Sequence, residues 1–470
     1  MKVLLVAPPK LGLHGSELFP PIGLGYIATK IKTIGCSVDI KDCLILNWDH
    51  TQLLDYIGQT QPELVGFTLF SQAFPKVNQI LKEIKAKYPS IITVVGGPHP
   101  TALPDKVLHE LPEADYACNG EGEFTLLKLI QKVKGEPMAF KDIPGLIWRE
   151  DGACHFNPKL EYSPIDDFGI PDWELINPNL YNIDKPNLEP HSAVIHTSRG
   201  CPFPCRFCVR LGRQLRHRSI EHIYEEMTYL NKNYGITKFY LGDEGFPINK
   251  KFVKDFCRFM IAQNDGYSFC AACGIRLNTL DAEMLELMKM ANFERDISVG
   301  IESGVPRVRN GLMNKNLSQA ELINGIDLLN KHGFKPAGNF IIGYPGETAQ
   351  EINETIRLAL RLHLWGAAFT PFMPLPGSEE TKALIEKGEI SADFDYTRIH
   401  LDSVLYAPPG MTPAQVDALR QKAVFRFNIQ PRVLFRHHLH PRRIGWTIVK
   451  FLRIFVPTRF LPQGLKRKIA

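Results

Sequence analysis

The stretch 197-TSRGCPFPCRFCVR-210 places three cysteines within eight residues: Cys201, Cys205 and Cys208. We expect a cytosolic location, where cysteines this close together usually bind a metal. A structural zinc site needs four ligands, and no fourth Cys or His follows at ligand spacing. An iron–sulfur cluster fits better, because thiolates are its usual ligands and three of them leave one iron open. Zinc, a disulfide pair and buried core thiols are the alternatives, and the spacing disfavours them.

The cysteine loop follows the first of six apolar segments that alternate with helical patterns. They lie at 192–198, 238–244, 268–276, 294–304, 336–347 and 367–378. Six strands, each followed by a helix, predict a partial (β/α)6 barrel over residues 191–385, with its chemistry at the carboxyl ends of the strands. The cysteine loop lies at such an end.

The first part of the chain shows a second alternating series. Its apolar runs lie at 2–8, 36–42, 62–71, 90–98 and 114–123. Near-continuous apolar strands separated by helices predict a doubly wound parallel sheet, a Rossmann-like α/β domain, over residues 1–145. The loops after these strands are rich in Gly and small hydroxyl residues, which allow a ligand to approach the backbone. The Pro- and Asp-rich stretch 146–190 is typical of a linker.

Charge is unevenly distributed over the 470 residues. The formal net charge is +5, yet no acidic residue follows Asp417, and 13 Lys and Arg lie between Arg420 and Lys468. Region 386–470 is therefore predicted to be helical and basic. Its apolar and basic residues suit either a helix that caps the barrel or an interfacial helix on an anionic membrane. No apolar run is long enough for a bilayer span, so we expect a cytoplasmic protein, with peripheral membrane contact as one reading of the tail.

The cysteine motif resembles the signature of the radical S-adenosylmethionine (SAM) superfamily, including the aromatic Phe207 before the last Cys. The resemblance implies that the three thiolates hold a [4Fe–4S] cluster and that SAM binds the fourth iron. Reduction of the cluster then cleaves SAM to a 5′-deoxyadenosyl radical, with flavodoxin or ferredoxin as the electron donor. It also implies SAM contacts at the later strand ends: Asp243 and Glu244 to the amino group, Arg276 to the carboxylate, Glu302 and Ser303 near SAM or its ribose, and Ile341 and Gly343 near the adenine.

The N-terminal loops resemble the cobalamin-binding domain that precedes many radical SAM enzymes. The resemblance places Gly96 and Gly97 beneath the nucleotide tail, Thr68 and Ser71 at the base, and Glu121 in the last loop of the site. There is no GxGxxG after the first strand, which disfavours an NAD site. The motif D-x-H-x-x-G is also missing, so no protein histidine is expected below cobalt.

These resemblances together imply a cobalamin-dependent radical SAM enzyme. The expected reaction is methyl transfer to an unactivated carbon, or to a phosphinate phosphorus, through the deoxyadenosyl radical and methylcobalamin. An oxidative cyclase or ring-rearranging enzyme is the alternative. A methylthiotransferase needs three further cluster cysteines, for which only Cys36, Cys43 and Cys118 are candidates, and a non-catalytic protein with a degenerate cluster is disfavoured by the intact motif. The substrate is expected to be a small molecule, such as a lipid or natural-product intermediate, and not a nucleic acid.

Overall fold

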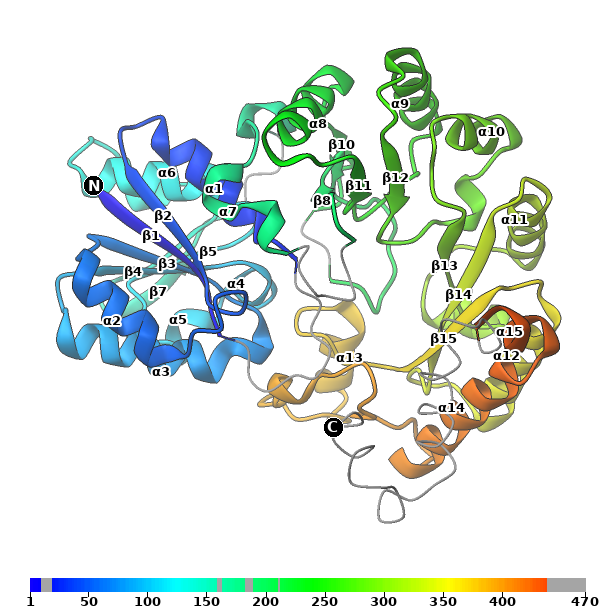
Figure 1. Cartoon of the computed structure of the whole chain (residues 1–470). Helices are drawn as coiled ribbons and strands as arrows, with labels where there is room; N and C mark the ends of the chain where they lie inside the picture. Colours follow the sequence, from blue (N-terminus) through cyan, green and yellow to red (C-terminus); the bar gives the residue numbers. More distant parts are fainter. Residues whose placement is uncertain (10–18, 159–162, 182–188, 210–211, 438–470) are drawn as a thin grey trace, which may run out of the picture.

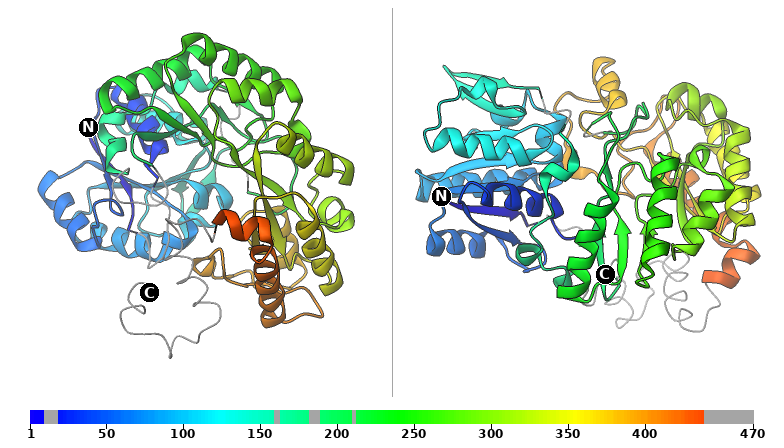
Figure 2. Two further views of the ribbon diagram at one scale, coloured as in Figure 1. Left: turned by 45° about the vertical axis from the view of Figure 1, so that its right-hand side comes forward. Right: turned by 90° about the horizontal axis from the view of Figure 1, so that it is seen from above.

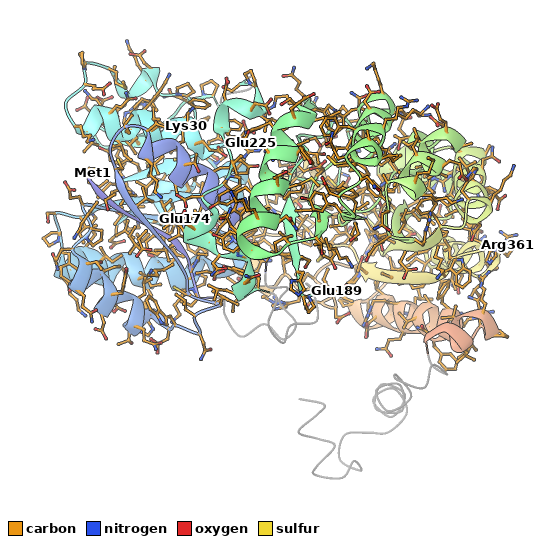
Figure 3. The ribbon with its side chains drawn as sticks, turned by 45° about the horizontal axis from the view of Figure 1, so that its top comes forward. Met1, Lys30, Glu174, Glu189, Glu225 and Arg361 are labelled. Atoms are coloured by element: carbon orange, nitrogen blue, oxygen red, sulfur yellow. The ribbon has the colours of Figure 1, made fainter. Side chains whose placement is uncertain are left out.

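The computed structural model describes residues 1–9, 19–158, 163–181, 189–209 and 212–437. An N-terminal sheet domain lies beside a curved row of strands and helices (Figure 1), and the views of Figure 2 agree on this arrangement. Met1 and Arg361 lie at opposite ends of the molecule in Figure 3. No helix among the described residues is long and apolar enough to cross a membrane. The predicted basic tail lies outside them from residue 438 onward.

The N-terminal domain is built on a seven-stranded sheet of order β2-β1-β3-β4-β5-β6-β7. Its first five strands pair in parallel, as predicted. In β3, Leu64 to Phe67 are all buried, which is expected of a strand covered on both faces. The strand bounds are β1 (Lys2–Ala7), β2 (Ser37–Asp42), β3 (Leu64–Thr68), β4 (Ile92–Gly96), β5 (Tyr116–Cys118), β6 (Leu146–Glu150) and β7 (Ala153–Phe156).

Helices cover both faces of this sheet, which confirms the doubly wound fold. On one face α1 (Ile22–Lys32) packs with α6 (Gly122–Val133), and on the other α2 (His50–Thr60) packs with α3 (Phe74–Lys87). Two short helices, α4 (Pro98–Ala102) and α5 (Val107–Glu110), connect β4 to β5. The apolar core of the α1 and α6 face is continuous with the barrel core, while the α2 and α3 face has its own core.

The sheet extends beyond the predicted domain boundary at residue 145. Strands β6 and β7 pair antiparallel with β5 and with each other, although the sequence predicted a linker there. Asp151 and Gly152 connect them with φ of 51° and 77°. Two central residues of positive φ, filled by Asp-Gly, are typical of a tight hairpin turn. Further on, α7 (Trp173–Ile176) contacts α1 and β2.

The second domain is a partial barrel, as predicted. Strands β8, β11 and β12 form one parallel sheet, and β13, β14 and β15 form another. Two isolated parallel bridges, from Phe269 to Phe293 and from Ile275 to Val299, join the two sheets into one curved row. The bounds are β8 (Ser192–Ile195), β11 (Lys238–Leu241), β12 (Ser268–Ala271), β13 (Asp296–Glu302), β14 (Lys335–Ile342) and β15 (Gly366–Pro371).

Helices follow the first five of these barrel strands in turn and cover the outside of the row. They are α8 (Ile220–Tyr234), α9 (Lys250–Gln263), α10 (Ala282–Met290), α11 (Gln319–Lys331) and α12 (Ala349–Arg361). The short antiparallel pair β9 (Ser198–Arg199) and β10 (Arg216–His217) flanks the cysteine loop.

The region after the last strand is helical in part. Helix α13 (Glu379–Glu386) lies between the two domains in Figure 1, and α14 (Pro413–Asn428), followed by α15 (Pro431–His437), packs on β15 and α12. Between α13 and α14 the chain forms only a short 3-10 turn at Tyr396–Arg398. This part of region 386–470 is less helical than predicted, and the turn packs against the N-terminal domain beside Ser71.

Candidate active site

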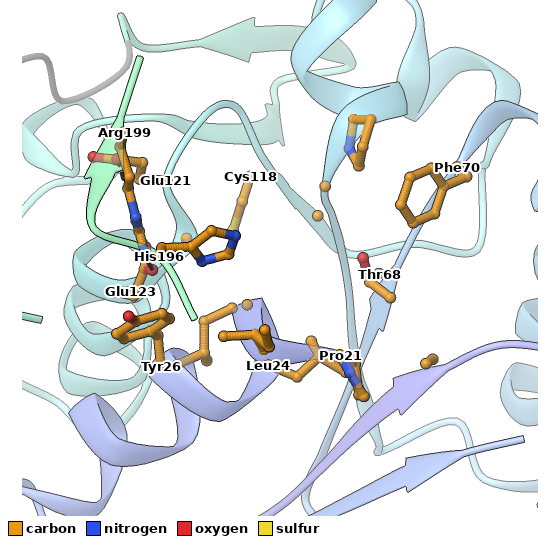
Figure 4. Close-up of a pocket in the computed structure, with 18 of the residues that line it drawn as sticks. Pro21, Leu24, Tyr26, Thr68, Phe70, Cys118, Glu121, Glu123, His196 and Arg199 are labelled. Atoms are coloured by element: carbon orange, nitrogen blue, oxygen red, sulfur yellow. Dashed lines mark hydrogen bonds and ion pairs between the residues drawn. The ribbon is translucent and has the colours of Figure 1, made fainter. Parts of the chain in front are cut away.

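A large cavity lies between the two domains, with a volume of about 1160 Å³. Its walls include the loops after β1 and β3, where the strand order of the first sheet reverses, which is the usual ligand position in such sheets. The barrel contributes the carboxyl ends of β8, β11 and β12. Figure 4 shows side chains from both domains, including Thr68 and His196, around this space.

Four of the five residues predicted to bind cobalamin line this cavity: Thr68, Gly96, Gly97 and Glu121. Ser71 does not line it; its buried hydroxyl lies 2.9 Å from Nδ1 of His99. Gly97 has a φ of +96°, and a Cβ there would lie 2.9 Å from the Thr68 hydroxyl. A glycine is therefore required for the backbone to pass this close to Thr68.

The three cysteines lie together on the loop between β9 and β10. Cys205 is buried, Cys201 is half-buried and Cys208 is exposed. Desolvation by surrounding atoms, then the charges of Cys205 and Glu302, raise the pKa of the Cys208 thiol to about 12. Within the described ranges no three His, Cys, Asp or Glu side chains gather closely enough for one metal ion. A cubane binds each thiolate through a different iron, so it needs ligands that stand further apart.

The cysteine loop is supported by the last part of the barrel. The backbone N–H of Arg206 donates to the carbonyl of Met313 at 3.1 Å, and its guanidinium lies 3.3 Å from Glu380. The predicted aromatic, Phe207, packs edge-on against Tyr344, with 6.5 Å between ring centroids. Tyr344 in turn donates to Glu380 at 2.7 Å. These contacts orient the part of the loop that carries the second and third cysteines.

The adjacent acids Asp243 and Glu244 have different surroundings. The Asp243 carboxylate is 1% exposed and accepts hydrogen bonds from the backbone of Thr197 and Ser198. Burial raises its pKa, and these hydrogen bonds oppose the shift. Glu244 is exposed and lines the cavity. Of the two residues predicted to hold the SAM amino group, Glu244 is the one that faces the space between the domains.

Arg276 lies beside the cysteine loop, and many of its donors are already used. Its Nε donates to Asn278 at 2.9 Å and its Nη2 to the carbonyl of Asn316 at 2.8 Å. The guanidinium also lies over the ring of Phe203, 3.5 Å from the centroid. Burial lowers its pKa, and the nearby Cys205 sulfur opposes this shift. Its contact with the SAM carboxylate remains a prediction.

Glu302 and Ser303, at the end of β13, point to different partners. The Glu302 carboxylate accepts a 2.6 Å hydrogen bond from Lys315, and it raises the pKa of that lysine against the effect of burial. A Cβ on Gly300 would lie 2.6 Å from this carboxylate and 2.8 Å from the lysine nitrogen, so the ion pair lies directly over Gly300. The Ser303 hydroxyl instead contacts Thr355 of α12 at 3.2 Å. Its contact with SAM remains a prediction.

The end of β14 and the turn after it carry the two residues predicted at the adenine. Ile341 is half-buried, and Gly343 has a φ of +74°. Glu347, which the sequence analysis did not single out, closes this turn by accepting from the N–H groups of Gly343 at 2.8 Å and Tyr344 at 3.1 Å. Its other carboxylate oxygen is buried without a partner. Burial raises the pKa of Glu347 to about 8.

Comparison with known proteins assigns this architecture. The Radical SAM superfamily model matches residues 195–359, and the B12 binding domain model matches residues 12–130. The chain is 30% identical to an uncharacterized methyltransferase of Pyrococcus horikoshii, over 93% of this chain and 95% of that protein. The chain belongs to the cobalamin-dependent radical SAM enzymes. It is also 28% identical to the anaerobic magnesium-protoporphyrin IX monomethyl ester cyclase of Rubrivivax gelatinosus, over 87% of this chain and 74% of that one.

Solved structures share the fold of this radical SAM enzyme. The radical SAM methyltransferase TsrM from Kitasatospora setae, solved with cobalamin and a [4Fe–4S] cluster bound, superposes with a TM-score of 0.69 at 18% identity. The match covers 89% of this chain and 84% of TsrM. It confirms the arrangement of an α/β cobalamin-binding domain beside a partial barrel.

The cofactors of the enzyme are a [4Fe–4S] cluster, SAM and cobalamin, and the residues present fit them. The three thiols on one loop match the donor set of a cluster with one open iron. The Thr68–Gly97 contact leaves a cradle of backbone at the cavity wall that any side chain on Gly97 would fill. Cluster binding displaces the thiol protons, because a bound metal centre deprotonates its cysteine ligands.

Besides Glu347, sequence reasoning missed His196, Arg199 and Lys315 at this radical SAM site. His196 and Arg199 line the cavity from the cluster side. Burial, together with the charges of Arg199 and Arg218, lowers the pKa of His196 to about 3, so its imidazole is neutral at physiological pH. His196 and Arg199 could have been found from the sequence, because they lie only a few residues before Cys201. Lys315 lies in a loop that carries no recognisable motif, so the sequence offered no signal for it.

Proposed function

We propose that this enzyme transfers a methyl group from SAM to an unactivated carbon, or to a phosphinate phosphorus, of a small molecule. The observation that carries the proposal is the shared cavity, into which the cobalamin loops of the first domain and the strand ends of the barrel both open. Bound cobalamin would supply a methyl carrier within this space. A substrate would reach the carrier and the SAM-derived radical without leaving it.

The described residues suit a division of tasks around this cavity. The cysteine loop borders the cavity through Gly200 and Gly212. Arg276 and Lys315 lie as cations beside its cysteines. Glu244 presents a carboxylate to the cavity and suits an ammonium group such as that of SAM. Another part of the wall, formed by Phe19, Leu24, Phe67 and Phe70, is apolar and suits a radical reaction, which is protected where water is kept away.

Methyl transfer is favoured over cyclisation because the match extends over more of the methyltransferase relative than of the cyclase relative. The match spans 95% of the protein named as a methyltransferase and 74% of the protein named as a cyclase. Cyclisation is the second candidate, because the match to the cyclase also runs through both domains of this chain.

The deciding experiment needs no knowledge of the substrate. Protein reconstituted anaerobically with iron, sulfide and cobalamin is incubated with a reductant and with SAM that carries a labelled methyl group. Methyl transfer predicts that S-adenosylhomocysteine forms and that the label stays on protein-bound cobalamin. Deoxyadenosine formation with neither of these products contradicts methyl transfer and favours the cyclase-type reaction.

Two partners belong to the same proposal. The cluster requires a low-potential one-electron donor, for which flavodoxin or ferredoxin is proposed; SAM cleavage should depend on adding one of them when no chemical reductant is present. The 13 basic residues after Asp417 suit contact with an anionic membrane. Co-sedimentation of full-length protein with anionic vesicles, compared with a chain truncated at Pro441, tests this contact, and equal soluble fractions contradict it.

A further inference from the structure

A buried cluster of charges connects the loop of the cysteines to a loop of the cobalamin-binding domain. Arg199, on β9, pairs with Glu121 at 3.2 Å and with Glu123 at 2.8 Å. Its neighbour across the β9–β10 pair, Arg216, also pairs with Glu121 and donates to the carbonyl of Ser163 at 2.7 Å. Figure 4 shows the Arg199 side chain running past Glu121 toward Glu123.

The Arg199 guanidinium is also held between two aromatic rings. It lies 4.8 Å from the centroid of Tyr26, on α1, and 4.5 Å from that of Phe168, in the segment between the domains. The Arg199 side chain is 16% exposed and that of Glu123 is 4% exposed. The Tyr26 hydroxyl accepts from Arg218 at 3.4 Å, which extends the contacts into the barrel core. The guanidinium is thus fixed in position and in plane.

Both ends of this charge cluster lie next to a cofactor site. Arg199 lies two residues before Cys201, the first cluster ligand. Glu121 and Glu123 lie on either side of Gly122, in the loop after β5, and Gly120 to Glu123 line the cavity. Arginine suits this place because its planar fork bonds two carboxylates while its face stacks on aromatic rings, which a lysine cannot do.

We propose that Arg199 is a positioning residue that sets the separation and orientation of the [4Fe–4S] cluster relative to cobalamin, by clamping the cysteine loop to Glu121 and Glu123. The inference rests on the presence of the two cofactors and holds for methyl transfer and for cyclisation alike. Its failure and the failure of the proposed function are therefore distinguishable.

A purely stabilising role is the competing explanation. Buried ion pairs contribute little net stability as a rule, because desolvation offsets their attraction. A stabilising role predicts that removing Arg199 lowers the unfolding temperature and leaves the geometry of the retained cofactors unchanged. A positioning role predicts altered geometry in protein that still folds and still holds both cofactors.

The test compares Arg199→Lys, Arg199→Met and Glu123→Gln in the full-length protein reconstituted with cluster and cobalamin. Arg307→Met is the matched control, since Arg307 forms a two-bond ion pair with Glu351 on the barrel exterior, at 2.7 and 2.8 Å. Iron and cobalamin are quantified first. Electron paramagnetic resonance then measures the spin–spin interaction between the reduced cluster and cobalt(II) in cobalamin, which depends on their separation and orientation.

We expect Arg199→Met and Glu123→Gln to retain both cofactors and to lose the wild-type spin–spin pattern, with Arg199→Lys intermediate and Arg307→Met unchanged. Where the wild type transfers methyl groups, transfer should fall about 10²-fold in Arg199→Met, with a smaller loss of deoxyadenosine formation. A wild-type spin–spin pattern in Glu123→Gln or Arg199→Lys overturns the proposal. So does loss of folding or of cofactors in every Arg199 and Glu123 variant, because that result assigns the charge cluster to stability alone.

Discussion

The carboxylate of Asp243, at the end of β11, accepts a 2.6 Å hydrogen bond from the backbone N–H of Thr197, at the end of β8. It accepts a second, from the N–H of Ser198, at 3.1 Å. The cysteine loop begins directly after Thr197 and Ser198. The side chain of Asp243, which follows β11, therefore orients the loop that leaves β8. Its neighbour Glu244 faces the cavity instead.

Substitution of the two acids should therefore separate cluster assembly from SAM binding. In Asp243→Asn a neutral amide replaces the charged acceptor of two buried backbone hydrogen bonds. We expect this change to destabilise the folded loop by about 1–3 kcal/mol. We expect a lower iron content per chain. Glu244→Gln should keep the iron content and weaken SAM binding roughly 10-fold. Iron analysis and equilibrium binding of SAM measure these effects, and the reverse pattern would show that the two roles are exchanged.

Loss of any cluster cysteine should stop radical formation and spare cobalamin binding. In Cys205→Ala a cubane would have two protein ligands, so we expect loss of iron and no deoxyadenosine above background. The cobalamin loops lie in a different domain, and cobalamin binding should stay within about twofold of wild type, as expected for independent sites. Cys154→Ala, on the edge strand β7, is the control and should retain all iron. Deoxyadenosine formation by Cys205→Ala would disprove the ligand assignment.

Substitution of Gly97 should weaken cobalamin binding, in addition to the loss of stability that any side chain causes at a residue with positive φ. Gly97→Ala adds a Cβ 2.9 Å from the Thr68 hydroxyl at the cavity wall. Gly135→Ala is a matched control, because Gly135 has nearly the same φ, +98°, with nothing within 4 Å of the added Cβ. We expect both variants to lose about 1–2 kcal/mol of stability, and only Gly97→Ala to lose cobalamin affinity. Equal cobalamin affinity in the two variants would place the cofactor elsewhere.

Stability should depend on pH through Glu347. Its pKa is about 8 in the folded protein, against an ordinary value of 4.5, so the folded state binds this proton more tightly than the unfolded state does. The resulting stabilisation is complete below about pH 4.5 and is lost as pH rises through 8. Glu347→Gln carries no charge and keeps an acceptor oxygen for Gly343 and Tyr344. Its unfolding temperature relative to wild type should therefore rise from pH 5 to pH 9, whereas parallel curves would mean that Glu347 is ionised throughout.

Several features of the fold followed from patterns between near neighbours in the chain. The spacing of Cys201, Cys205 and Cys208 predicts a cluster loop, because one loop supplies all three thiols. The alternation of apolar strands and helices predicted both domains, since a parallel sheet buries its strands on both faces. The hairpin of β6 and β7 was missed although Asp151-Gly152 carries its turn signal, because the surrounding Pro and Asp residues indicated a linker.

The direction of individual side chains at the site was decided by tertiary structure. Asp243 and Glu244 are adjacent in the loop after β11, and only the packing of β8 against β11 determines which of them is buried. Arg199 meets Glu123 across 76 residues and Lys315 meets Glu302 through a loop, and no periodic pattern records such distant pairs. The sequence by itself determined the two domains and predicts the cluster ligands, because both depend on local spacing and burial. Folding of one domain against the other decided which charges meet between the two cofactor sites, because that depends on side chains brought together from distant parts of the chain.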